Sequence, residues 1–122
     1  MTHRLGIIGA GNMGGAIVRG CIRAGAYAAS EVIVADVDAS KLDDLRGLGI
    51  EVTHDASLAA RSANIILAVK PQVFGDVARL IAPLPQSTVV ISIMAGLNSR
   101  WIRTALGATA RVIRVMPNMT IW

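Results

Sequence analysis

Residues 5–14, LGIIGAGNMG, decide the fold, because an apolar run leads directly into the pattern Gly-x-Gly-x-x-Gly at positions 9, 11 and 14. This pattern indicates a dinucleotide-binding turn when it follows a hydrophobic strand and opens a helix, as the flanking residues predict here. Gly9 would allow the tight turn, Gly11 would let a diphosphate approach the backbone, and Gly14 would let helix and strand pack closely. The free amide groups and the positive end of the helix dipole would then hold the diphosphate.

Outward from this stretch, short runs rich in Val, Ile and Leu alternate with segments of helical periodicity. The alternation is typical of repeated β–α units that form a parallel sheet covered by helices on both faces. Strands are predicted near residues 4–8, 31–35, 50–52, 64–69, 88–93 and 111–115. Six such strands complete a doubly wound α/β fold of the Rossmann type, whose usual strand order is 3-2-1-4-5-6.

The segments between the strands carry helix start and stop signals. The first helix is predicted from about residue 12 to residue 24, with Gly25 as its stop and one apolar face made of Met13, Ile17, Cys21 and Ala24. Further start signals are Asp38, Asp55, Pro71 and Asn98, and Gly47 and Gly107 mark two helix ends.

The composition of the 122 residues excludes several classes of protein. The single cysteine excludes a disulfide framework, and no spacing of metal-ligating residues suggests a metal site. The net charge of +4 comes from scattered cations and aromatics are only 3%, which is unlike a nucleic-acid binder. The longest apolar stretch, residues 89–97, is too short to span a membrane. Without a cleavable signal pattern, a cytoplasmic location is expected.

Asp36, at the end of the second predicted strand, suggests how the adenosine end of a cofactor is recognised. It follows Gly14 at close to the roughly 20-residue offset at which a carboxylate grips the ribose hydroxyls of NAD. A carboxylate there would repel the extra phosphate of NADP, and Lys41 is the only nearby cation. We therefore expect NAD(P)H as cofactor, with NADH favoured by Asp36. No catalytic residue is predicted.

Four motifs together resemble one enzyme family. They are GAGNMG at 9–14, AVKPQ at 68–72, SIMAG at 92–96 and RVIRVMPN at 111–118. In order and spacing they are similar to pyrroline-5-carboxylate reductase, and the resemblance covers nearly the whole chain. It implies an NAD(P)-dependent oxidoreductase of proline biosynthesis, which reduces 1-pyrroline-5-carboxylate to L-proline by hydride transfer. GAGNMG alone is shared by many reductases, whereas AVKPQ and RVMPN are more specific.

Carried over by position, the resemblance implies three groups of cofactor contacts. The glycine-rich loop would hold the pyrophosphate through Ile8, Gly9, Ala10, Gly11, Asn12, Met13 and Gly14. Asp36 and Asp55 would lie near the adenosine ribose, although relatives often have asparagine at the second position and Asp55 also suits a helix cap. The path to the nicotinamide would be lined by Ala68, Val69, Lys70, Pro71, Ile93, Met94 and Ala95.

The resemblance also implies a domain that this sequence does not contain. Residues 1–118 correspond to the NAD(P)-binding Rossmann domain, and 119–122 to the start of a connection to a helical domain. That domain completes the site for the small cyclic imine carboxylate and forms the dimer in the family. We therefore expect the isolated chain to be inactive and a full-length parent to be a homo-oligomer. A non-catalytic dinucleotide-binding module and a reductase related to β-hydroxyacid dehydrogenases remain the alternatives.

Overall fold

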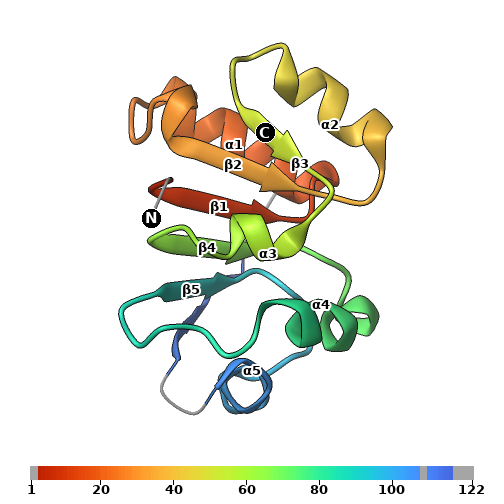
Figure 1. Ribbon diagram of the computed structural model, residues 1–122, viewed down its shortest axis with the longest axis vertical. Helices are drawn as coiled ribbons and strands as arrows, with labels where there is room; N and C mark the ends of the chain where they lie inside the picture. Colours follow the sequence, from red (N-terminus) through yellow and green to blue (C-terminus); the bar gives the residue numbers. More distant parts are fainter. Residues whose placement is uncertain (1–2, 108–109, 117–122) are drawn as a thin grey trace.

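The computed structural model describes residues 3–107 and 110–116, and they form one parallel six-stranded sheet between two layers of helices (Figure 1). The strand order is β3-β2-β1-β4-β5-β6, which confirms the predicted Rossmann-type fold. The strands are β1 Leu5–Ile8, β2 Val32–Ala35, β3 Glu51–Thr53, β4 Asn64–Leu67, β5 Val89–Ser92 and β6 Arg111–Arg114. All five strand pairs are parallel, so the carboxyl ends of the strands share one edge of the sheet.

The helices begin and end close to the predicted signals. They are α1 Asn12–Arg23, α2 Ala39–Arg46, α3 Ala56–Ala59, α4 Phe74–Ile81 and α5 Ser99–Leu106, with short 3₁₀ turns η1 Ala29–Glu31 and η2 Pro71–Val73. The side chains of Asp38, Asp55 and Asn98 cap α2, α3 and α5 as predicted. Pro71 opens η2 and not α4 itself, because the chain makes one tighter turn before the helix begins.

Two apolar clusters hold the helices to the two faces of the sheet. Leu5 and Ile7 of β1 pack in the cluster that contains Val18 of α1 and Leu42 and Leu45 of α2. The opposite cluster is built on the alternate strand residues and on α3, α4 and α5. Successive side chains of a strand point to opposite faces, so short continuous apolar strands supply both cores.

The predicted apolar face of α1 is partly wrong. Ile17 and Cys21 are partly buried and pack against the core as predicted, whereas Ala24 is exposed and the fully buried apolar side chain of the helix is Val18. The buried face is turned toward Gly14 and Gly15, because glycines allow this helix to approach the sheet most closely along their side. None of the helices in residues 3–107 and 110–116 has the length and apolar character needed to cross a membrane.

Candidate functional site

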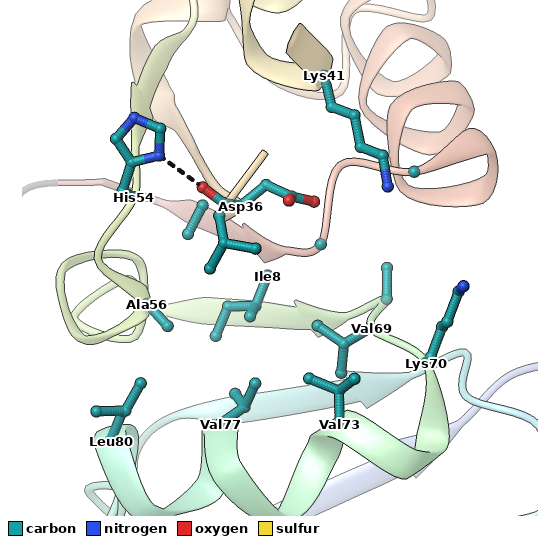
Figure 2. A pocket seen from close by; sticks show the side chains of 15 residues that line it. Ile8, Asp36, Lys41, His54, Ala56, Val69, Lys70, Val73, Val77 and Leu80 are labelled. Atoms are coloured by element: carbon teal, nitrogen blue, oxygen red, sulfur yellow. Dashed lines mark hydrogen bonds between the residues drawn. The ribbon is translucent and has the colours of Figure 1, made fainter. Parts of the chain in front are cut away.

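A cavity of about 270 Å³ lies at the carboxyl ends of the central strands. The ends of β1, β2 and β4 contribute Ile8, Ala35, Asp36 and Ala68, and α4 contributes one wall (Figure 2). Ligands of open α/β sheets bind at this edge, where the strand order reverses between β1 and β4. The cavity is therefore the first candidate for a binding site.

The three glycines of the loop between β1 and α1 each meet a different steric requirement. Gly9 has a φ of 108°, and a Cβ there would lie 2.7 Å from the backbone of Ala68. A Cβ on Gly14 would lie 2.2 Å from the carbonyl oxygen of Gly9. Gly11 differs, because a Cβ there would meet no atom within 4 Å. Gly9 and Gly14 thus shape the loop, and Gly11 leaves open space beside it.

The amino terminus of α1 faces this open space without a capping side chain. Its N-cap residue is Gly11, no side-chain hydrogen bond reaches the first turn, and that turn contains no acidic residue. By contrast, side-chain oxygens cap α2, α3 and α5. The first N–H groups of an α-helix have no partner within the helix, so those of α1 are available to an anionic group.

Asp36 lies at the end of β2 with its carboxylate toward the glycine-rich loop. One carboxylate oxygen accepts the backbone N–H of Ala10 at 2.7 Å, and the other accepts the N–H of Asp38 at 2.8 Å. Asp36 is half-buried and lines the cavity. Asp36 therefore reaches the cavity, and its role at a ribose stays a prediction; its bond to Ala10 is a contact that the sequence did not indicate.

One wall of the cavity is apolar and belongs to η2 and α4. Val73, Val77 and Leu80 point toward the cavity from successive turns, opposite Asp36 and His54 (Figure 2). Val73 and Leu80 are 41% and 63% exposed, so this wall is open to a ligand. Sequence reasoning missed these residues, although their spacing along one helical face was the available signal.

A larger groove of about 870 Å³ continues from the cavity between α1 and α2. Lys41 and Lys70 line both spaces, and Arg19 and Arg23 line the groove. Asp44 is the only carboxylate on its lining, and none of the four cations belongs to an ion pair in the described part of the chain. The open surface beside α1 is therefore positively charged.

The structure brings most of the predicted loop residues to these two spaces. The cavity or the groove is lined by Ile8, Gly9, Ala10, Gly11, Asn12, Asp36, Ala68, Val69 and Lys70. The other predicted residues do not line either space: Met13, Gly14, Asp55, Pro71, Ile93, Met94 and Ala95. Gly14 acts through packing, and the segment from Ile93 follows β5, the strand next to β4.

His54 and Asp55, which follow β3, have different surroundings. His54 lines the cavity, and its Nδ1 donates a hydrogen bond to the carbonyl oxygen of Asp36 at 3.1 Å. Asp55 instead accepts the hydroxyl and the backbone N–H of Ser57. The Ser57 hydroxyl, followed by its N–H, holds the pKa of the Asp55 carboxyl below its ordinary value. The side chain of Asp55 thus acts as a helix cap in this structure.

Within residues 3–107 and 110–116, no three side chains of His, Cys, Asp or Glu come together as a metal site would require. The site combines the uncapped amino terminus of α1, the Asp36 carboxylate beside it, an apolar wall and a cationic groove. These features suit a ligand with an anionic centre, hydroxyl groups and a flat apolar part.

Comparison with protein families matches residues 4–96 to the family described as NADP oxidoreductase coenzyme F420-dependent. Among curated relatives, a pyrroline-5-carboxylate reductase of Methanosarcina acetivorans is 40% identical over 121 residues, which are 97% of this chain and 45% of that protein. The resemblance predicted from the four motifs is confirmed. The chain spans less than half the length of this relative.

Two solved structures of reductases with related names have a fold similar to that of this chain. A pyrroline-5-carboxylate reductase from Coxiella burnetii has a TM-score of 0.87 and 32% identity, covering 98% of this chain and 45% of that one. A pyrroline carboxylate reductase from Plasmodium falciparum, solved with NADP bound, has a TM-score of 0.83 and 28% identity, covering 95% of this chain and 42% of that one.

Proposed function

This chain belongs to the family described as NADP oxidoreductase coenzyme F420-dependent, and from that premise we propose that it is the NAD(P)H-binding part of a pyrroline-5-carboxylate reductase. The parent enzyme would reduce 1-pyrroline-5-carboxylate to L-proline in proline biosynthesis. The relatives that carry this name support the substrate. The observation that carries the cofactor is the uncapped amino terminus of α1, with Gly11 leaving space for a diphosphate.

The residues present fit the diphosphate of a dinucleotide. An anion at Gly11 would meet the free N–H groups of the first turn of α1 and the positive end of its dipole. Lys41 and Lys70 line both the cavity and the groove, as Gly11 does, so both cations border the space that the anion would occupy. The proposed contacts of the loop are Ile8, Gly9, Ala10, Gly11, Asn12, Met13 and Gly14.

The apolar cavity fits the adenine. Its volume of about 270 Å³ lies just below the range of roughly 300–1,000 Å³ typical of pockets for whole drug-sized ligands. The space therefore suits one end of a dinucleotide, with the base against Val73 and Val77 and the ribose toward Asp36. The sequence also predicts that Asp55 lies near the ribose. The Asp55 carboxylate is exposed, and Asp55 follows β3 directly after His54, which lines the cavity.

We propose that NADH is preferred over NADPH because Asp36 faces the ribose. The carboxylate would accept the hydroxyls of NADH and would repel the additional phosphate of NADPH. Lys41 on the same cavity reduces this repulsion, so the chain would bind both cofactors with unequal affinity.

The nicotinamide end would lie toward Ala68–Pro71 and Ile93–Ala95, which follow β4 and β5. When bound, the reduced cofactor supplies a hydride to the C=N carbon of the substrate, and the protein supplies orientation. We propose residues 1–118 as the dinucleotide-binding domain and 119–122 as the start of a connection to a second domain that holds the cyclic imine carboxylate and forms a homo-oligomer. Residues 117–122 lie outside the described part of the chain.

Titration with NADH and NADPH tests the proposal. Trp101 is 47% exposed and its ring packs against Phe74, the first residue of α4. Because α4 also contributes Val77 and Leu80 to the cavity, Trp101 fluorescence is the readout of binding. We expect both cofactors to bind saturably, NADH more tightly than NADPH. In Asp36→Ser, the ratio of NADH affinity to NADPH affinity should be smaller than in the wild type. Binding of neither cofactor would refute the function, and an unchanged ratio would refute the role of Asp36 in the preference.

A further inference from the structure

We propose that Asp36 also positions the glycine-rich loop, so that its carboxylate is needed for diphosphate binding as well as for recognition of the ribose. This inference rests on the proposed binding of a dinucleotide. It assigns to one side chain a second role, which acts through the backbone of Ala10.

All four polar groups of Asp36 are hydrogen-bonded, and they join the ends of three neighbouring strands. The carboxylate accepts the N–H of Ala10, after β1, at 2.7 Å and the N–H of Asp38, after β2, at 2.8 Å. The backbone N–H donates to the carbonyl of Thr53 on β3 at 3.1 Å. The backbone carbonyl accepts the N–H of His54 Nδ1 at 3.1 Å, which is the dashed line in Figure 2. Asp36 is thus the common anchor of three loops.

The bond to Ala10 fixes the peptide that leads into the anion site. The N–H of Gly9 donates to the carbonyl of Ala35 at 2.8 Å, and the next N–H, of Ala10, donates to Asp36. Two successive peptides of the loop are therefore bonded to β2 and the residue that follows it. The first intrahelical bond of α1 comes later, from Gly15 to Gly11, and no capping side chain reaches the first turn. The first N–H groups of the helix have no partner within it, so they are available to an anion.

Loss of the carboxylate would leave the Ala10 N–H without its acceptor. Ala10 is only 7% exposed, and a buried N–H without a partner is unfavourable. The loop would then lower its free energy by moving toward water or by turning this peptide, and either change would displace Gly11 and the start of α1. Bonds to an ionised acceptor are stronger than neutral ones, so an amide cannot replace the carboxylate fully.

The positioning role leaves capacity for the ribose. An ionised carboxylate offers about four acceptor sites, and the two backbone bonds use two of them. Asp36 still lines the cavity, so the remaining sites can accept ribose hydroxyls.

Inorganic pyrophosphate separates the two roles, because it has no ribose. Asp36→Asn removes a negative charge near the anion site, and electrostatics alone would strengthen pyrophosphate binding in this variant. The positioning role predicts the opposite, a loss of about tenfold, the size of effect expected for one misplaced charge-assisted bond. Isothermal titration calorimetry at low salt, in a buffer without phosphate, measures both affinities.

Asp38→Asn is the matched control. It removes the same charge two residues away. Asparagine can still cap α2, because its side-chain oxygen can accept the backbone N–H of Ser40 as the Asp38 carboxylate does. We expect Asp38→Asn to bind pyrophosphate at least as tightly as the wild type. Unchanged or tighter binding by Asp36→Asn would overturn the inference, whereas a wild type that binds neither NADH nor NADPH would overturn the proposed function itself.

NMR of the wild type tests the same bond without any variant, in case Asp36→Asn does not fold. We expect a scalar coupling across the hydrogen bond between the Ala10 nitrogen and the carboxyl carbon of Asp36, and slow hydrogen exchange of the Ala10 amide. Absence of the coupling together with rapid exchange of this amide would overturn the inference.

Discussion

Replacement of Gly11 by valine should separate cofactor binding from folding. In the free protein a Cβ at this position meets no atom within 4 Å, and the backbone is extended at φ −69° and ψ −167°, which suits a β-branched residue. The only expected cost to folding is a poorer N-cap, about 1 kcal/mol or less. The side chain would instead occupy the space in front of the first turn of α1.

The expected effect on binding follows from the contacts that would be lost. If the valine side chain keeps the diphosphate from two N–H groups, the loss is about 1.5–3 kcal/mol for each bond to a charged group. Together these values correspond to a Kd about 100-fold higher or more. Titration with NADH measures the Kd, and urea unfolding followed by far-UV circular dichroism measures stability.

Gly75→Val is the control for the same substitution elsewhere. Gly75 lies in α4, a Cβ there would also meet no atom within 4 Å, and the residue does not line the cavity. NADH affinity should remain that of the wild type. If Gly11→Val bound NADH as tightly as the control, the assignment of the glycine-rich loop to the diphosphate would be wrong.

Three further outcomes are expected. The purified 122-residue chain should oxidise no NADH in the presence of 1-pyrroline-5-carboxylate, because orientation of the imine can contribute about 7–11 kcal/mol of barrier lowering; proline formation at an enzymatic rate would contradict the need for a second domain. Acid should destabilise the chain below about pH 3.8, the ordinary pKa of an aspartate, because hydrogen bonds from Ser40 and Ser57 hold the pKa values of Asp38 and Asp55 below it. Protonation of these carboxylates in the folded state loses that stabilisation. In urea unfolding between pH 5 and pH 2, the double variant Asp38→Asn, Asp55→Asn should lose less free energy of unfolding than the wild type. Phe74→Ala should lower the free energy of unfolding by about 3–5 kcal/mol because the ring is fully buried, and a loss under 1 kcal/mol in urea unfolding would contradict this.

The fold could be predicted because its signals are local. Strand runs, the glycine pattern and the caps at Asp38, Asp55 and Asn98 each depend on a few adjacent residues, and the structure has all of them. The face of α1 was less predictable, since apolar spacing alone did not show that the side carrying Gly14 approaches the sheet most closely.

The site was predictable where one loop supplies it and less so where distant segments meet. The glycine-rich loop and Asp36 follow from their spacing in the sequence. Spacing puts Val73, Val77 and Leu80 on one face of η2 and α4, but whether that face turns toward the cavity is set by how α4 packs on the sheet. The bond between Asp36 and Ala10 depends on the separation of two strand ends, and no pattern of residue types indicates that separation.

The cationic groove has a consequence for handling the protein. Arg19, Arg23, Lys41 and Lys70 surround one open volume with a single carboxylate among them, so their mutual repulsion is relieved by any small polyanion that enters. Phosphate, sulfate or citrate in a buffer would therefore raise the melting temperature and also compete with a nucleotide. Affinities for anionic ligands measured in such buffers would be underestimated, and high ionic strength would weaken the same competition.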